Sequence, residues 1–147
     1  MLGRVYIPTR DWVGCAAAKT LDSMSADPKW WVLVVPSDQF RAYSAVWPGN
    51  VIDGGDDRSY MALANAAISA SKANGEERRW ILDDRCTGFA LTDRETLKKE
   101  MLEDWADLYP AMDAIAEYAH ESGIVDAGLG EVGAGSGPLK YRVWNPS

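Results

Sequence analysis

The sequence has few of the residues on which thiol, disulfide and zinc chemistry depend. Its two cysteines, Cys15 and Cys86, show neither a metal-binding spacing nor a disulfide framework, which suits a reducing cytoplasm. Neither has a positioned base that the sequence identifies, so nucleophilic catalysis by a thiol is not supported. The single histidine, His120, falls late in a predicted helix, where an interaction with the helix dipole is a simpler role than catalysis.

Long apolar runs are also missing. No segment approaches the roughly 18 apolar residues of a membrane span, and the N-terminal apolar stretch is too short for a signal peptide. The 147 residues contain no internal repeat and no interdomain linker, and this is the length of one domain. We therefore expect a single cytoplasmic domain over residues 1–147 with no membrane partner.

Positive charge is in deficit. Lysine and arginine number 15 against 22 aspartates and glutamates, giving a formal net charge of −7. This balance argues against a surface that coats nucleic-acid phosphates over a wide area. An enzyme that acts on nucleic acid needs only a local positive cleft, so DNA stays open as a substrate.

The first half of the chain alternates between short apolar runs and helical patterns. The predicted strands are residues 4–7, 30–35, 51–52 and 79–82. The predicted helices are 12–24, a short one around Phe40 and Tyr43, and 59–73. In the last of these, Met61, Ala64 and Ile68 are expected to face inward, and Leu63 and Ala67 widen the apolar face. This alternation predicts an α/β fold: a Rossmann-like, mostly parallel sheet with flanking helices and right-handed crossovers.

The second half has a different pattern. Residues 88–91 indicate a short strand, and Thr92 with Glu95 forms a capping-box pattern that predicts a helix, which Pro110 separates from a second helix ending at Gly123. Residues 124–129 and 139–144 are strand-like and flank a glycine-rich stretch, 130–137. We expect residues 1–91 to form a nucleotide-binding half and residues 92–147 a small α+β extension, helical and glycine-rich. Because the chain stops just after a predicted strand, we suspect a shortened protein.

The strongest candidate for chemistry is the pair Asp83 and Asp84. The apolar run that precedes them predicts a buried strand, and open α/β sheets bind ligands at the carboxyl ends of their strands. Two carboxylates there can hold Mg²⁺ or Mn²⁺ against a pyrophosphate. A polar turn after the strand explains the same two residues equally well.

Two further loops are candidates for anion binding. Thr9 and Arg10 follow the first strand, where an arginine can pair with a phosphate, although a surface turn is the simpler explanation. The glycine-rich loop from Asp53 to Arg58 opens a helix and can form an anion cradle, or simply be a flexible loop. It is not a P-loop, because no Gly-Lys-Ser/Thr follows Gly55.

Several motifs occur in a suggestive order: Val5-Tyr6-Ile7-Pro8-Thr9-Arg10, Val34-Val35-Pro36-Ser37-Asp38 with Tyr43, Arg58 opening a helix, Ile81-Leu82-Asp83-Asp84, and Asp126-Ala127-Gly128-Leu129 before the glycine-rich stretch. Their order and spacing resemble GT-A-fold glycosyltransferases, in particular the small phage-encoded members associated with DNA base hypermodification. The resemblance extends over about residues 3–137, although each motif is short.

The resemblance implies roles for individual residues. Thr9 and Arg10 would contact the nucleotide, Arg58 would meet the phosphates, and Asp83 and Asp84 would serve the sugar and a divalent metal, Mn or Mg. Members of the group commonly have a third acidic residue, often the direct metal ligand, where this chain has Arg85. An arginine there either replaces the metal as a phosphate clamp or marks a degenerate site.

The resemblance implies a function as well. The chain would move a sugar from a nucleoside diphosphate sugar to an acceptor, with a modified base in phage DNA as one candidate, in the host bacterial cytoplasm. One alternative is a catalytically weak or inactive GT-A-like phage protein that binds or inhibits a protein partner, or that forms a homo-oligomer. The other is a nucleotidyltransferase, whose glycine-rich signature after the first strand is poorly matched by Thr9-Arg10-Asp11-Trp12.

Overall fold

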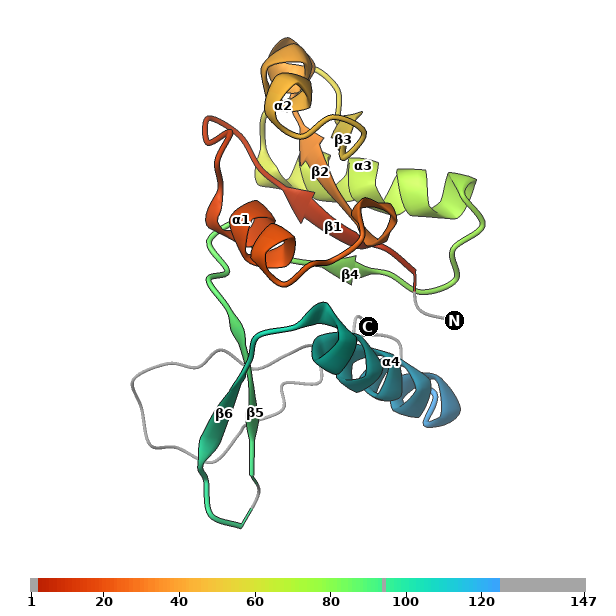
Figure 1. Ribbon diagram of the computed structural model, residues 1–147. Coiled ribbons are helices and arrows are strands. Elements are labelled where there is room, and N and C mark those ends of the chain that lie inside the picture. Colours follow the sequence, from red (N-terminus) through yellow and green to blue (C-terminus); the bar gives the residue numbers. More distant parts are fainter. Residues whose placement is uncertain (1–2, 94, 125–147) are drawn as a thin grey trace.

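The fold is α/β, built on a sheet of four parallel strands. A computed structural model describes residues 3–93 and 95–124 (Figure 1). The strands are β1 (Val5–Pro8), β2 (Trp31–Val35), β3 (Val51–Asp53) and β4 (Trp80–Ile81), and they lie in the order β3-β2-β1-β4. Each neighbouring pair is parallel, which confirms the parallel sheet predicted from the alternating pattern.

Helices connect successive strands and cover both faces of the sheet. They are α1 (Ala16–Ser23), α2 (Phe40–Val46) and α3 (Tyr60–Ala73), with 3₁₀ turns over Pro28–Trp30 and Ser37–Gln39. Figure 1 shows α1 and α3 on opposite faces of the sheet. The chain then forms a hairpin of β5 (Phe89–Thr92) and β6 (Lys99–Leu102), which extends away from the sheet, and ends its described part with α4 (Trp105–Glu121).

The alternation of side chains along β1 and β2 divides the core into two layers. On one face, the odd-numbered strand residues pack with α1, α2, β5 and α4; they are Val5, Ile7, Trp31, Leu33 and Val35. On the other face, Tyr6, Val32 and Val34 pack with Leu63 and Ala67 of α3. Successive residues of β1 and β2 point to opposite faces of the sheet, and both faces are covered. The sequences of these two strands are therefore apolar throughout.

The strand order creates a crevice beside β1. From β1 the chain moves outward through β2 to β3, and it then returns to add β4 on the other side of β1. Open α/β sheets bind ligands at such a reversal, outside the carboxyl ends of the two strands. In this chain Thr9 follows β1 directly and Asp83 lies two residues beyond β4, which places the predicted candidates at the same point of the sheet. The strand before Asp83 was expected to be buried, but β4 is a two-residue edge strand, and Ile81 is 36% exposed.

The helix expected over residues 12–24 begins later, at Ala16. The preceding loop is held in a non-helical path by contacts with distant residues. The Trp12 amide donates to the Tyr43 hydroxyl at 2.9 Å, and the Trp47 indole donates to the Val13 carbonyl at 2.7 Å. The first turn of α1 is hydrogen-bonded to the loop after β4, because the Ala17 amide donates to the Asp84 carbonyl at 3.0 Å.

The helix expected after Thr92 is wrong, because that segment is the β5–β6 hairpin. Thr92 pairs with Lys99 in the antiparallel ladder. The side chain of Asp93 accepts hydrogen bonds from the amides of Glu95 and Thr96, and so builds a turn in place of the predicted capping box. The expected strand at residues 88–91 is confirmed as β5.

Two helical details also differ from the prediction. Helix α4 runs continuously through Pro110, where two helices were expected, and the Asp104 side chain caps its first turn by accepting from the Ala106 amide at 2.9 Å. In α3, Leu63 and Ala67 of the expected apolar face are buried, together with Ser71, but Met61, which was expected to face inward, is 67% exposed. Apart from Ile124, the strands expected at 124–129 and 139–144 and the glycine-rich stretch between them lie outside the described residues.

Among the helices that the structure describes, none combines the length and apolarity needed to cross a bilayer.

Candidate functional site

A cleft of about 240 Å³ opens at the reversal between β1 and β4. Its walls come from the ends of these two strands and from the start of α3, and they comprise Pro8, Thr9, Arg10, Tyr60, Leu63, Asp83, Asp84 and Arg85. The cleft therefore contains four of the six predicted nucleotide-sugar residues together with Asp84. Only Asp53 and Arg58 of the predicted set are not part of its walls.

Thr9 and Asp84 join the two strands at the floor of the cleft. The Thr9 hydroxyl donates to Asp84 Oδ2 at 2.9 Å and lies 3.5 Å from the hydroxyl of Tyr43. Thr9 and Tyr43 are both buried, at 2% and 0% exposure. A buried side chain held by two partners has few alternative positions, so this bond fixes where the Asp84 carboxylate can point.

Asp83 is engaged by its near neighbour Arg85. Its Oδ1 accepts from the Arg85 backbone amide at 2.8 Å and from Nε at 3.1 Å, and its Oδ2 accepts from Nη2 at 3.1 Å. This hydrogen bonding lowers the pKa of the Asp83 carboxyl below its usual value. The Cys86 amide also donates to the Asp83 carbonyl at 3.1 Å, so residues 83–86 form a compact turn.

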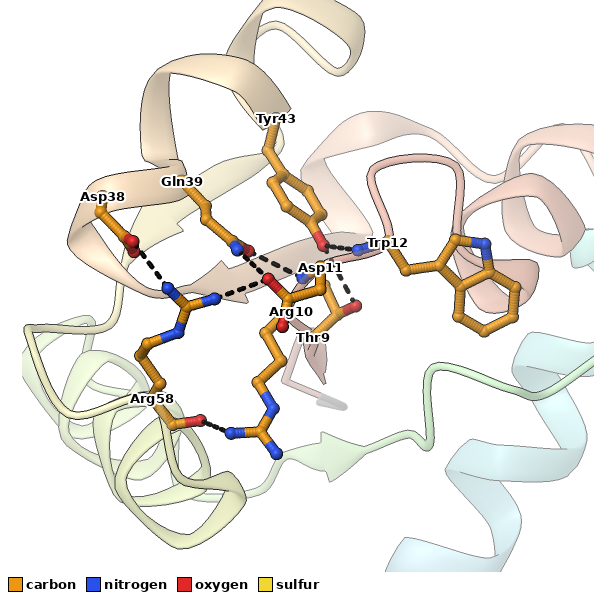
Figure 2. A network of polar contacts seen from close by, with 8 residues as sticks. All are labelled: Thr9, Arg10, Asp11, Trp12, Asp38, Gln39, Tyr43 and Arg58. Carbon is orange, nitrogen blue, oxygen red and sulfur yellow. Dashed lines mark hydrogen bonds and ion pairs between the residues drawn. The ribbon is translucent and has the colours of Figure 1, made fainter.

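Arg10 and Arg58 belong to a network of polar contacts between the loops that follow β1, β2 and β3 (Figure 2). The Arg58 guanidinium binds Asp11 at 2.5 Å and Asp38 at 2.8 Å, and so ties these loops together. Arg10 donates to the Arg58 carbonyl at 2.6 Å. The Arg58 guanidinium is therefore bound to two carboxylates outside the cleft, and the residue does not line the cleft. Arg10 does line it.

The same network restrains the loop after β1. The side chains of Gln39 and Asp11 bond to each other, and the Asp11 amide donates to Gln39 Oε1 at 2.8 Å. The hydrogen bond from Gln39, followed by those from Arg58, lowers the pKa of the Asp11 carboxyl. Asp11 adopts φ +56°, a left-handed conformation that aspartate tolerates better than most residues.

Asp53 lies at the end of β3, away from the cleft. Its Oδ1 accepts from the Ser37 hydroxyl at 2.5 Å and from the Gly55 amide at 2.9 Å. These bonds lower the pKa of its carboxyl. The Gly55 amide therefore already donates to a carboxylate. An anion cradle in the glycine-rich loop would need this amide to bind the anion.

Tyr60 is a cleft residue that the sequence analysis did not single out. It is the first residue of α3, after the Ser59 N-cap, and 53% of it is exposed. Partial burial, followed by the charges of Asp83 and Asp84, raises the pKa of its phenol. The signal that could have identified Tyr60 is an aromatic residue at the start of a helix that follows a glycine-rich loop. The sequence argument relied only on the charge of Arg58 at that helix start.

The turn of the β5–β6 hairpin forms a second hollow, of about 520 Å³. Its walls are Leu91, Thr92, Asp93, Thr96, Lys98, Lys99 and Glu100, all exposed. It lacks the buried, converging polar groups that distinguish binding sites. The cleft beside β1 is therefore the better candidate, although it is smaller.

The cleft residues do not fit a divalent metal well. Of the four carboxylate oxygens of Asp83 and Asp84, three already accept hydrogen bonds, two of them from the Arg85 side chain. A divalent ion about 4 Å from a guanidinium is repelled by about 2 kcal/mol even in bulk water. Across the described residues, no group of three or more metal-binding side chains gathers at one point.

The cleft can, however, recognise a ligand that carries both phosphates and hydroxyls. Arg10 and Arg85 offer guanidinium donors, the groups best suited to phosphate. The carboxylates of Asp83 and Asp84 accept hydrogen bonds, and Tyr60 offers an aromatic surface. Binding pockets for small molecules usually measure about 300–1,000 Å³, so the cleft accommodates part of a nucleotide-sized ligand.

Comparisons with protein-family models, with curated proteins and with solved structures find no match to this chain.

Proposed function

We propose that this chain is a GT-A-like glycosyltransferase that binds a nucleoside diphosphate sugar in the cleft between β1 and β4. The observation that carries the proposal is the meeting of Arg10 and Arg85 with Asp83 and Asp84 at the reversal of a β3-β2-β1-β4 sheet. Ligands of open α/β sheets bind at this point. The resemblance of the strand-end motifs to GT-A enzymes supplies the reaction type.

Each part of the donor has a chemical counterpart in the cleft. The diphosphate suits the guanidinium groups of Arg10 and Arg85, and the sugar hydroxyls suit Asp84, which Thr9 holds in place at 2.9 Å. The exposed ring of Tyr60 can cover the face of a sugar or a base. The nucleoside would extend beyond the cleft, whose 240 Å³ is too little for the whole donor.

In the proposed reaction, the bond between the sugar's anomeric carbon and the diphosphate oxygen breaks, and its electron pair leaves with the diphosphate. A hydroxyl of the acceptor forms the new bond to the anomeric carbon and releases its proton to solvent. The chain's contribution is to orient the donor and to stabilise the charge that develops on the leaving diphosphate. A modified base in phage DNA is the acceptor that the resemblance favours.

Isothermal titration with a panel of UDP-, GDP-, ADP-, CDP- and dTDP-sugars tests donor binding. We expect one nucleotide class to bind and Asp84→Asn to weaken it. Asp22→Asn, a change of the same type at an exposed position of α1, should leave binding unaltered. If no sugar nucleotide binds to the folded wild-type protein, with or without Mn²⁺, the proposal is wrong.

A second candidate is a protein that binds the donor without transferring its sugar. The observation that favours it is the pairing of Asp83 with Arg85, which occupies a carboxylate that a metal-dependent transferase would use. Mass spectrometry of DNA incubated with the bound donor separates the two. Donor binding together with a sugar-shifted nucleoside supports the transferase, whereas binding with neither product nor donor hydrolysis supports the binding protein.

A further inference from the structure

We propose that Arg85 takes the place of a divalent cation in this cleft, so that the donor's diphosphate binds to guanidinium groups and needs no metal. This inference rests on the proposed function, since it concerns how the same donor is held. It follows from two observations: Arg85 lines the cleft, and its side chain donates hydrogen bonds to the Asp83 carboxylate.

Asp83 pairs with the Arg85 guanidinium at the surface of the cleft, where the Arg85 side chain is 79% exposed. Two side-chain contacts of 3.1 Å join the two groups edge to edge, and the backbone amide of Arg85 adds a third bond to the same carboxylate. The pair is only two residues apart, within the turn of residues 83–86. The planar fork of a guanidinium is itself preorganised, so less freedom is lost for each hydrogen bond that it forms to a phosphate.

The two arginines of the cleft approach it from opposite sides of the reversal. Arg10 follows β1 and is anchored to the Arg58 carbonyl at 2.6 Å, and Arg85 follows β4 and is anchored to Asp83. Each guanidinium carries a formal charge of +1, so both attract the anionic diphosphate. Guanidinium groups also bind phosphate oxygens in pairs of parallel hydrogen bonds, which gives the diphosphate a fixed orientation.

This arrangement assigns different tasks to the two carboxylates. Asp83 serves as the anchor of Arg85, while Asp84 is anchored by Thr9 through one oxygen, Oδ2. Asp84 therefore suits a sugar hydroxyl better than a metal ion, because a single carboxylate beside a guanidinium is a poor cation site.

The test is titration calorimetry with UDP, GDP, ADP, CDP and dTDP and with the matching sugar nucleotides, in EDTA and again in Mn²⁺ or Mg²⁺. We expect the nucleotide that binds to do so with the same affinity in EDTA and in metal. Arg85→Ala should weaken it in EDTA by about 10- to 100-fold, the range expected for loss of a charge-assisted contact. Arg41→Ala, which removes an exposed arginine from α2, should have no effect.

A second variant reverses the chemistry of the position. Arg85→Asp places three carboxylates in succession, so nucleotide binding should be lost in EDTA and partly restored by Mn²⁺. Wild-type binding that requires Mn²⁺ would overturn the inference while leaving the proposed function standing. Full nucleotide binding by Arg85→Asp in EDTA would also overturn the inference and leave the proposed function standing. Absence of nucleotide binding under every condition would overturn both.

Discussion

The hydroxyl of Thr9 donates a 2.9 Å hydrogen bond to Asp84 Oδ2, linking two residues that are 75 positions apart in the chain. Each residue follows a strand at the reversal of the sheet, and the bond crosses between those strands. It accounts for the burial of a polar side chain and fixes the carboxylate at the floor of the cleft.

Thr9→Val should destabilise the fold and disorder the cleft. The substitution keeps the shape of the side chain but leaves Asp84 Oδ2 without its partner, which should cost about 1 kcal/mol in the free energy of unfolding. Urea unfolding measures the change. Thr87→Val, at an exposed position just beyond the cleft, is the matched control and should be close to neutral. Equal effects of the two substitutions would contradict the role assigned to Thr9.

Arg85→Ala should raise the pKa of the Asp83 carboxyl towards its ordinary value. Hydrogen bonds from the Arg85 side chain are the largest cause of the lowered pKa. Because the folded-state pKa is lowered, the stabilisation from this contact is present above the ordinary carboxyl pKa of about 4 and is lost as the pH falls through the folded value. Asp83 is 53% exposed, so the free energy involved is small.

Carboxyl carbon shifts, followed by NMR between pH 2 and 6, measure this pKa in the wild type and the variant (roughly the carboxyl titration range). Asp53 is an internal control, because its lowered pKa depends on Ser37 and Gly55 and should not move. An Asp83 pKa that stays the same in Arg85→Ala would show that the contact is absent in solution.

Gly54→Ala should destabilise the protein by about 1–3 kcal/mol, the usual cost of overpacking. A Cβ atom at this position would lie 2.6 Å from Leu63 Cδ2 and 3.0 Å from the Val35 carbonyl oxygen. Leu63 is 1% exposed and has little room to move. Thermal and urea unfolding report the cost.

Gly14→Ala provides the comparison for Gly54→Ala. There the added Cβ would meet only the end of the Lys19 side chain, at 3.1 Å, and that side chain is exposed and flexible. We expect a change of less than half that at position 54. If both substitutions are tolerated equally, Leu63 does not pack against Gly54 as closely as the structure describes.

Leu97→Gly tests whether this segment forms the hairpin of the structure or the helix predicted from the sequence. Leu97 has φ +56°, and 73% of it is exposed, so glycine relieves backbone strain and removes little burial. In the hairpin the substitution should be neutral or stabilising by up to about 1 kcal/mol, whereas in a helix it should cost about 1 kcal/mol. Hydrogen exchange of the β5 and β6 amides measures the local effect. Lys98→Gly should weaken the segment in either case.

The sheet was largely predictable because its signal is local. The apolar runs that became β1 and β2 are buried on both faces, and the turns and glycines between the elements mark where each ends. The alternation of strands and helices then leaves few arrangements open to a parallel sheet. The hairpin was not predicted, because Thr92 and Glu95 have the spacing of a capping box. In the structure the Asp93 side chain accepts hydrogen bonds from the amides of Glu95 and Thr96, which builds a turn there.

Less of the site could be predicted. The positions of Thr9, Arg10, Asp83 and Asp84 at strand ends follow from the sequence, and the structure brings them to one cleft. The partners of Arg58 could not be foreseen, because Asp11 and Asp38 lie 47 and 20 residues away from it. Without those partners, an arginine in a glycine-rich loop looks like a phosphate ligand.

The sequence alone determined which segments form the sheet and which residues follow its strands, because burial and strand periodicity act over a few neighbouring residues. The tertiary structure decided what each of those residues contacts. Hydrogen bonds such as Thr9–Asp84 and Arg58–Asp11 join loops that only the completed sheet brings together. It also gave Tyr60 a place in the cleft, since the start of α3 meets the end of β4 only after the chain has crossed back past β1.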